Sequence, residues 1–223
     1  MKELSIILVN YNTTEDMVEC INSILRSEIK ISYEIIVVDN DSNKQAEVVS
    51  RLRNTFEDLK IVAKGRNLGF ACANNIGIKY AVGKMLLFLN PDVIVDKYAI
   101  MQLYEFMQRH PEAGLVGPLT IDSSGKLDYY CGFSFPTLIS EILHHSGLSK
   151  IFPKSRFFGQ GLMTYWDHKT TKEVEAIQGS AMMVRMDDIL KIGNMDENFF
   201  LFCEDTDWCY RYRKSGKKNY LCA

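Results

Sequence analysis

The sequence lacks three motifs that would place it in a common enzyme class. No G-x-G-x-x-G follows the first apolar run, which counts against a dinucleotide-binding Rossmann domain. No G-x-x-x-x-G-K-[ST] occurs, which excludes a P-loop nucleotide hydrolase, and the serine of a G-x-S-x-G elbow is absent as well. The chemistry must therefore be sought in other residues.

An excess of positive charge, closely paired cysteines and long apolar runs are absent as well. The formal net charge of −2 argues against nucleic acid as the main partner, because phosphate binding needs a basic face. The cysteine spacing fits neither a zinc site nor a secreted disulfide framework, so we expect reduced thiols in a cytoplasmic protein. No signal-peptide pattern precedes the first strand, and the apolar runs are too short to cross a bilayer. The cysteines are Cys20, Cys72, Cys131, Cys203, Cys209 and Cys222.

The first part of the chain alternates apolar runs with segments of helical periodicity. Because the runs are continuously apolar, they predict a mostly parallel sheet that helices cover on both faces. The composition, 47% hydrophobic and 24% charged, is that of an ordinary globular protein. We therefore predict a single α/β domain. The strand-like runs are residues 4–9, 33–38, 59–63 and 84–89.

Polar side chains follow the carboxyl ends of these four strands. In parallel sheets, ligands bind beyond the carboxyl ends of the strands, so we expect the polar groups to converge in one crevice. Pro91 removes an N–H and stiffens the turn that holds Asp92 at its strand end. This convergence is the main structural argument for a site. The residues are Asn10, Asn12, Asp39, Asp41, Asn67, Asn90 and Asp92.

The second half of the chain is less regular. Residues 132–172 form a long irregular segment, and such segments usually serve as a lid or a binding surface. A strand is predicted over 173–185, a short helix near 187–192 and a further helix from about residue 204. Residues 217–223 are typical of a strand that stops as it begins, which suggests a truncated chain.

The residues alone leave two explanations open for each candidate carboxylate. Asp39 could bind a ligand or cap the next helix, although Asp41 and Ser42 are better placed for the cap. Asp92 could hold a divalent cation or belong to a turn without a ligand. The acids at 204 and 205 follow an aromatic run, where apolar walls would raise proton affinity and suit a general base. They could equally be acids that the helix macrodipole favours.

Six short blocks, in this order along the chain, resemble family 2 glycosyltransferases of the GT-A fold. The version with Asn-Pro-Asp is similar to the rhamnosyltransferase-like branch, and the resemblance spans essentially the whole chain. It implies a Rossmann-like, mostly parallel central sheet flanked by helices, with a smaller mixed subregion on the acceptor side. The blocks are residues 5–12, 38–42, 67–70 with Asn74 and Gly77, 89–92, 179–183 and 204–205.

The resemblance also implies residue roles. Residues 1–95 would bind the nucleotide donor, and residues 96–223 would supply the acceptor site and catalytic base of the same domain. Asp205 matches the family's catalytic base, with Glu204 as its partner toward the acceptor. Asp92 matches the last acid of the D-x-D motif, which would hold Mg²⁺ or Mn²⁺ against the diphosphate. The implied donor-site residues are Asn10, Asn12, Asp39, Asp41, Asn67, Gly69, Asn90, Gly179 and Ser180.

The sequence departs from the family pattern in two places. Asn90 stands where many relatives carry the first acid of D-x-D, which lowers the expected affinity for the metal. Relatives also tend to carry a histidine shortly beyond the position of Ala223. A truncated chain would bind the donor yet turn over slowly.

The implied reaction is inverting transfer of a sugar from a nucleotide-diphosphate donor to a hydroxyl group. The expected donor is a dTDP- or UDP-sugar such as dTDP-rhamnose, and the acceptor a saccharide or lipid-linked molecule in surface polysaccharide synthesis. Asp205 would take the acceptor proton while the cation stabilises charge on the leaving diphosphate. Residues 133–152 mix apolar and basic side chains. They leave peripheral contact with the inner face of the membrane open, beside the simpler explanation of a lid.

Two other functions are alternatives to glycosyl transfer. A sugar-phosphate nucleotidyltransferase would need a glycine-rich, arginine-containing loop after the first strand, and residues 10–12 offer none. A non-catalytic nucleotide-sugar-binding subunit of an assembly complex is consistent with Asn90 and with the abrupt end of the chain. Glu204 and Asp205 argue against it, because a binding module has no use for a placed base.

Overall fold

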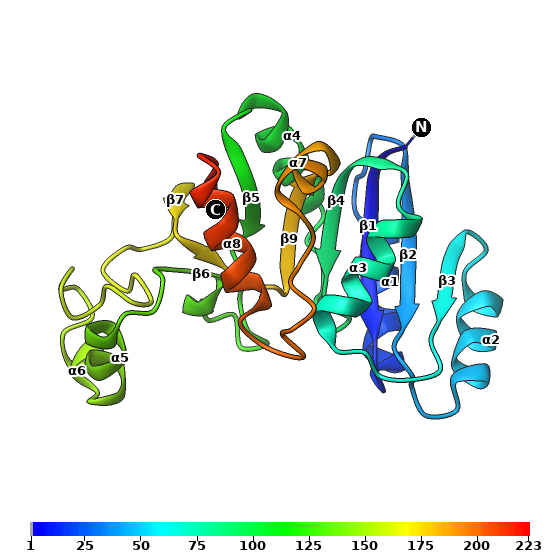
Figure 1. The fold of residues 1–223 in the computed structure, drawn as a ribbon, viewed down its shortest axis with the longest axis horizontal. Helices are drawn as coiled ribbons and strands as arrows, with labels where there is room; N and C mark the ends of the chain where they lie inside the picture. The colour runs from blue at the N-terminus through cyan, green and yellow to red at the C-terminus, as the bar shows by residue number, and fades with distance from the viewer. Residues whose placement is uncertain (1) are drawn as a thin grey trace.

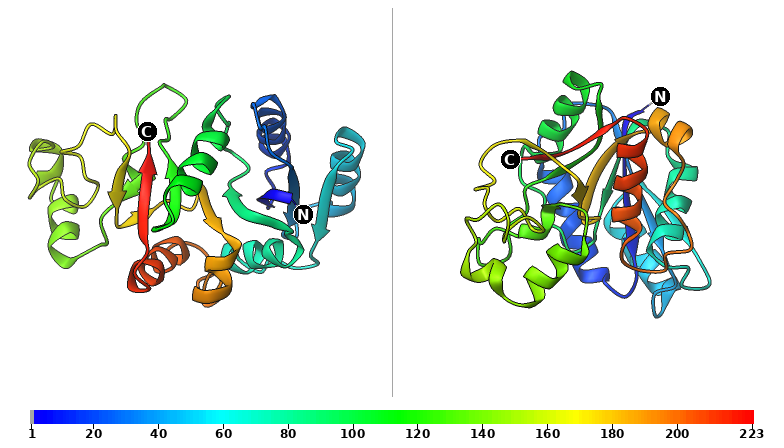
Figure 2. Two further views of the ribbon diagram at one scale, coloured as in Figure 1. Left: turned by 90° about the horizontal axis from the view of Figure 1, so that it is seen from above. Right: turned by 60° about the vertical axis from the view of Figure 1, so that its left-hand side comes forward.

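The computed structural model describes residues 2–223. An eight-stranded sheet in the order β3-β2-β1-β4-β9-β5-β10-β7 crosses the molecule, with helices on both faces (Figures 1 and 2). Only β9 and β7 run against the other strands, so the predicted mostly parallel sheet is confirmed. The elements are β1 (Lys2–Asn10), α1 (Thr14–Arg26), β2 (Tyr33–Asp39), α2 (Gln45–Thr55), β3 (Leu59–Ala63), α3 (Phe70–Tyr80), β4 (Gly83–Leu89), α4 (Ala99–Arg109), β5 (Ala113–Pro118), η1 (Tyr129–Cys131), β6 (Gly132–Phe133), α5 (Leu138–His145), α6 (Leu148–Ile151), β7 (Lys172–Val174), β8 (Ala176–Ile177), β9 (Ala181–Arg185), α7 (Met186–Ile192), α8 (Glu204–Lys214) and β10 (Lys218–Cys222).

Two apolar cores form because successive strand residues point to opposite faces of the sheet. In β1, Ile7 and Val9 join the core that also contains Trp208 of α8 and residues of α3 and α7. Leu8 points the other way, into the core that contains residues of α1, α2 and α4. With both faces covered, every residue of β1 from Leu4 to Asn10 is buried. This double burial explains why the strands are continuously apolar in sequence.

Strand β9 joins the two halves of the chain. It lies antiparallel between β4 and β5, and Ala181 at its start pairs with Leu89 at the end of β4. The turn before β9 therefore sits at the carboxyl end of β4. The predicted single strand over 173–185 was wrong, because this segment forms β7, β8 and β9, with a turn at Gly179 and Ser180 between the last two.

The predicted irregular segment 132–172 was wrong in part, because it contains two helices. The hydroxyl of Thr137 accepts from Ser140 N at 3.1 Å while Ser140 Oγ accepts from Thr137 N at 2.8 Å, a capping box that starts α5. Helices α5 and α6 project from one end of the molecule, away from the large sheet (Figure 1). Within residues 2–223, no helix has the length and apolar character needed to cross a membrane.

Candidate active site

The carboxyl ends of β1 and β2 are tied together by a buried hydrogen-bond network. Asn10 pairs with Asp39 in register, and Asn10 Nδ2 donates to Asp39 Oδ2 at 2.7 Å and to Ser42 Oγ at 2.9 Å. Asp39 Oδ1 accepts from Ser42 N at 3.0 Å and from Gln45 Nε2 at 2.6 Å. The side chains of Asn10 and Asp39 are fully buried. Both residues therefore shape the floor of the predicted crevice, and ligand contact by Asp39 stays a prediction.

The loop after β2 is held by the same network. Asn12 N donates to Ser42 Oγ at 3.0 Å, and Asn43 N donates to Asn12 Oδ1 at 2.7 Å. Asn12 and Asp41 adopt the left-handed conformation, with φ of 60° and 74°, which Asn and Asp tolerate better than most residues. The expected capping of α2 by Asp41 or Ser42 was wrong, since no side chain caps this helix. The Ser42 hydroxyl instead joins the two loops.

Asn40 is a structural residue of this site that the sequence interpretation missed. Its side chain is buried; Asn40 Nδ2 donates to Asn67 Oδ1 at 2.9 Å, and its Oδ1 accepts from Leu68 N at 3.0 Å. Asn67 Oδ1 also accepts from Gly69 N at 2.9 Å. Asn67 is a predicted residue of the nucleotide-donor site, but its side-chain oxygen is bonded within the protein, to Asn40 and Gly69. Nothing in the local pattern distinguishes Asn40 from its polar neighbours, because its partners lie on a distant loop.

Gly69 allows the start of α3 to approach the loop that precedes α8. A side chain on Gly69 would place its Cβ 2.5 Å from the carbonyl oxygen of Phe200, and its φ of 84° favours glycine. Phe70 N donates to that same carbonyl at 2.8 Å. The Phe70 N–H at this helix start is thus already paired within the protein. The structure gives Gly69 a packing role, and its donor contact stays a prediction.

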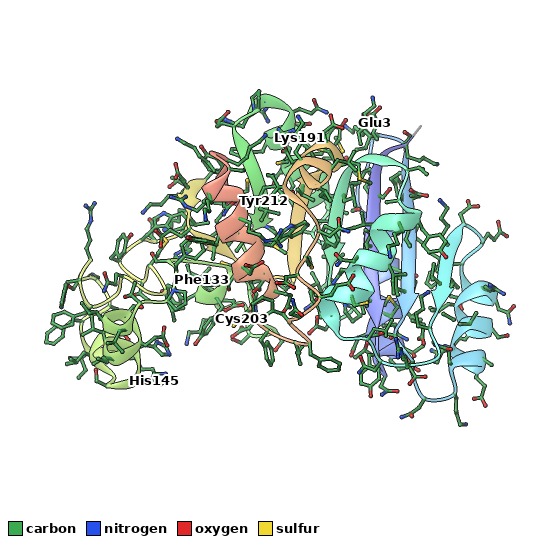
Figure 3. The ribbon with its side chains drawn as sticks, viewed as in Figure 1. Glu3, Phe133, His145, Lys191, Cys203 and Tyr212 are labelled. Carbon is green, nitrogen blue, oxygen red and sulfur yellow. The ribbon has the colours of Figure 1, made fainter. Side chains whose placement is uncertain are left out.

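Asp205 lies where the two halves of the chain meet. Its Oδ2 accepts from Gly179 N at 2.8 Å, while its Oδ1 accepts from Thr206 N at 2.6 Å. The next residue, Ser180, accepts at its carbonyl oxygen from Asn90 N at 2.8 Å. A backbone hydrogen bond and a bond to the Asp205 carboxylate therefore connect the end of β4 with the start of α8. Cys203, labelled in Figure 3, marks this start at the end of the molecule toward which β1 and β2 point (Figure 1).

Glu204 differs sharply from its neighbour Asp205. Its side chain is 4% exposed, and its Oε2 has no hydrogen-bond partner within residues 2–223. Burial raises the pKa of the Glu204 carboxyl, and the nearby Asp205 raises it further. Burial distinguishes the Glu204 side chain from the half-buried Asp205, and its expected role toward the acceptor stays a prediction.

Asp92 and Asn90 extend from the end of β4 as a sparse set of oxygen donors. Asp92 is exposed and forms no salt bridge within the described part of the chain. No group of three or more His, Cys, Asp or Glu side chains in residues 2–223 could hold a metal ion by itself. Mg²⁺ is commonly bound by one or two carboxylates plus substrate phosphates and water. The residues present therefore fit a cation that arrives with a diphosphate, and do not fit a cation held by protein alone.

The family of the chain follows from comparison with known proteins. The family described as "Glycosyl transferase family 2" matches residues 5–169, a range that contains the strand-end network and Asp92. The chain belongs to this family. The matched range stops before Asp205, so the identification of a family 2 glycosyltransferase does not by itself assign the base.

Curated relatives support the rhamnosyltransferase-like branch. This family 2 glycosyltransferase is 29% identical over 222 residues to the low-salt glycan biosynthesis hexosyltransferase of Haloferax volcanii, covering 97% of this chain and 63% of the relative. It is 26% identical over 232 residues to the N-acetylglucosaminyl-diphospho-decaprenol L-rhamnosyltransferase of Mycobacterium tuberculosis, covering 96% of this chain and 71% of that protein. The chain thus spans about two thirds of the length of these relatives.

A solved structure confirms the GT-A fold. The mannosyltransferase PcManGT from Pyrobaculum calidifontis, determined in complex with GDP-Man and Mn²⁺, superposes with a TM-score of 0.70 at 14% identity. The superposition covers 100% of this chain and 55% of that protein. At this identity the likeness shows the fold alone.

Proposed function

We propose that this chain carries out inverting sugar transfer from a nucleotide-diphosphate donor to a hydroxyl acceptor, with Asp205 as the catalytic base. The observation that carries the proposal is the contact path from Asn90, two residues before Asp92, through Ser180 and Gly179 to Asp205. This path would bring the residues proposed to bind the donor diphosphate close to the proposed base. Such an arrangement suits a single displacement in which the acceptor hydroxyl attacks as the diphosphate leaves.

Asp205 keeps capacity to accept the acceptor's proton. A carboxylate offers about four acceptor positions. Among residues 2–223, three are used, by Thr206 N, Thr206 Oγ1 and Gly179 N, and only the last of these engages Oδ2. The bonds hold the carboxylate in one orientation and leave Oδ2 with room for one more donor. Asp205 is also half-buried, so an acceptor can reach it.

The donor side is proposed to follow the strand ends. Asn10, Asp39 and Ser42 would fix the shape of the base pocket through their buried network. Tyr11, 46% exposed beside them, offers an aromatic face on which a base could stack. Asn12, Asp41 and the 67–69 loop would border the nucleoside. Residues 1–95 would thus serve the donor and residues 96–223 the acceptor and base.

Asp92, with the side-chain oxygen of Asn90, would hold Mg²⁺ or Mn²⁺ together with the donor phosphates. When bound, the cation would offset the negative charge that grows on the leaving diphosphate. The protein's own contribution is to keep Asp92 at the end of β4, where the Asn90 backbone is bonded to Ser180. Gly179 and Ser180 would then border the donor sugar.

The names of two relatives narrow the choice of donor and acceptor. One relative is named for L-rhamnosyl transfer to a diphospho-decaprenol-linked sugar and another for hexosyl transfer in glycan biosynthesis. We therefore propose a dTDP- or UDP-sugar donor, including dTDP-rhamnose, and a saccharide or lipid-linked acceptor in surface polysaccharide synthesis at the cytoplasmic side of the membrane.

Replacement of Asp205 by Asn tests the assignment of the base. An amide cannot take the acceptor proton, so transfer should fall by about 10²- to 10⁴-fold. Donor affinity, measured by calorimetry, should change little. Asp187→Asn is a matched control, because Asp187 is an exposed acid in the first turn of α7.

The Asn side chain can accept from only one of the two backbone donors that Asp205 now serves, so thermal unfolding must be measured alongside. Normal transfer by Asp205→Asn would refute the catalytic assignment. Loss of donor binding with unchanged transfer per bound donor would make Asp205 a residue that only positions Gly179.

A further inference from the structure

A surface that the donor site does not use covers helices α5 and α6 and the loop that follows them. We call residues 138–157 the basic–apolar lobe. It projects from one end of the molecule and lies level with the carboxyl ends of β1 and β2 (Figure 1).

The lobe exposes bulky apolar side chains that the fold does not bury. In α5 only Ser140 and Leu143 are buried, so the other aliphatic residues of this helix face outward. A folded chain rarely leaves so many large apolar side chains together without a partner. The exposed fractions are 79% for Leu138, 56% for Ile139, 57% for Ile142, 65% for Ile151, 50% for Phe152 and 58% for Phe157.

Cations are interspersed among these apolar residues. The lobe contains Lys150, Lys154 and Arg156 but only one acid, Glu141, although the whole chain has a formal net charge of −2. All three cations are exposed, and none forms a salt bridge within residues 2–223. The lone acid faces His145 of its own helix, at 3.7 Å. The lobe is therefore a local positive surface on a chain that is slightly negative.

The combination of exposed apolar side chains and cations in the lobe favours one kind of binding partner. Apolar side chains with Lys and Arg beside them are typical of segments that lie in the interface of an anionic bilayer. A second copy of the chain would fit poorly, because a two-fold contact would place the cations of one lobe against those of the other. We propose that the basic–apolar lobe docks the protein on an anionic lipid surface.

Docking by this lobe would also set the orientation of the molecule. The lobe belongs to residues 96–223, the half to which the acceptor site is assigned, so a lipid-linked acceptor would be met at the membrane surface. Vesicle binding is measured without donor or acceptor. Failure of the docking proposal can therefore be distinguished from failure of the proposed function.

The test is flotation of the 223-residue chain with vesicles of phosphatidylcholine alone and of phosphatidylcholine containing phosphatidylglycerol. Binding is expected only with phosphatidylglycerol, and it should weaken as salt screens the surface charge. In Lys150→Gln/Lys154→Gln, affinity should fall by about 25-fold, since each cation near an anionic surface contributes about fivefold. In Leu138→Ser/Ile142→Ser, affinity should fall by about tenfold or more as apolar insertion is lost.

Helix α7 supplies matched controls on the opposite side of the molecule. Leu190 is 76% exposed, nearly as much as Leu138, and Lys191 is exposed and labelled far from His145 in Figure 3. Leu190→Ser and Lys191→Gln should bind vesicles as the unchanged chain does. All variants alter exposed side chains, so each should keep its melting temperature within about 1–2 °C.

Three outcomes would overturn the proposal. The first is absence of binding to either vesicle, and the second is equal loss of binding in lobe and α7 variants. The third is a dimer in sedimentation that Leu138→Ser/Ile142→Ser converts to monomer while vesicle binding is unchanged, which would assign the surface to a second copy.

Discussion

Replacement of Gly69 by Ala should both destabilise the fold and disturb the site. Gly69 has φ 84° and ψ 170°, a region of backbone conformation that is essentially confined to glycine and costs other residues about 1–3 kcal/mol. The new Cβ would also lie 2.5 Å from the Phe200 carbonyl oxygen, so backbone must move as well. A loss of about 2–3 kcal/mol would lower the melting temperature by about 4–12 °C in a chain of this size.

Gly65 provides the control for this experiment. It lies in the same loop, has no positive φ, and a Cβ there would meet nothing within 4 Å. Gly65→Ala should leave stability unchanged or raise it by less than about 1 kcal/mol, because alanine restricts the unfolded chain. Thermal unfolding of both variants, followed by circular dichroism, decides the matter. Equal melting temperatures for Gly69→Ala and Gly65→Ala would refute the argument that close approach to Phe200 requires glycine.

The same pair of variants probes the link between packing and catalysis. Phe200 belongs to the loop that leads directly into α8 and Asp205, and Phe70 N donates to its carbonyl. Displacement of this loop should lower the transfer rate of Gly69→Ala even at temperatures where both variants are fully folded. An unchanged rate with a lowered melting temperature would show that the loop moves without disturbing Asp205.

Two further perturbations test the buried polar groups. Asn40→Ala should lower the free energy of unfolding by about 1–3 kcal/mol, because the part-buried Leu68 N–H loses its acceptor. Urea unfolding measures this change, and an unchanged midpoint would contradict a stabilising role for the Asn40 hydrogen bonds to Leu68 and Asn67. Burial raises the pKa of Glu204 above its usual 4.5, so the folded protein holds the carboxyl proton more tightly than the unfolded chain does. The stability of the fold therefore falls as pH rises from 4.5 through the folded pKa. Glu204→Gln removes this titration. The variant's free energy of unfolding, minus that of the unchanged chain, should therefore increase as pH rises from 4.5 through the folded pKa of Glu204. If this difference in free energy of unfolding did not vary with pH, the raised pKa would be contradicted.

The central part of the fold could be predicted because it depends on short-range pattern. The strands β1, β2 and β4 are buried on both faces, so their residues form continuous apolar runs that mark them in the sequence. Helix α5 could not be predicted in the same way. Its exposed face is apolar, with Leu138 and Ile142 open to solvent, so the usual contrast between a buried apolar face and a polar face is lost.

The candidate site, like the fold, could be predicted from the sequence only in part. Convergence of polar groups at strand ends follows from the parallel sheet, and the structure confirms it for Asn10 and Asp39, which are paired in register. The contacts of Asn40 and the burial of Glu204 could not be predicted, because both depend on tertiary structure that local sequence does not encode. The same holds for Gly69, whose neighbour Phe200 is brought near only by folding.

Nucleotide binding by calorimetry tests the central claim most directly. The chain and its Asp92→Asn variant are titrated with dTDP, UDP and GDP, each with and without Mn²⁺, and Asp96→Asn serves as a control because Asp96 is an exposed acid in the same segment. We predict that a pyrimidine diphosphate binds more tightly with Mn²⁺, and that Asp92→Asn alone loses this enhancement. Absence of binding by all three diphosphates, or the same Mn²⁺ enhancement in Asp92→Asn, would contradict a donor crevice built on the end of β4.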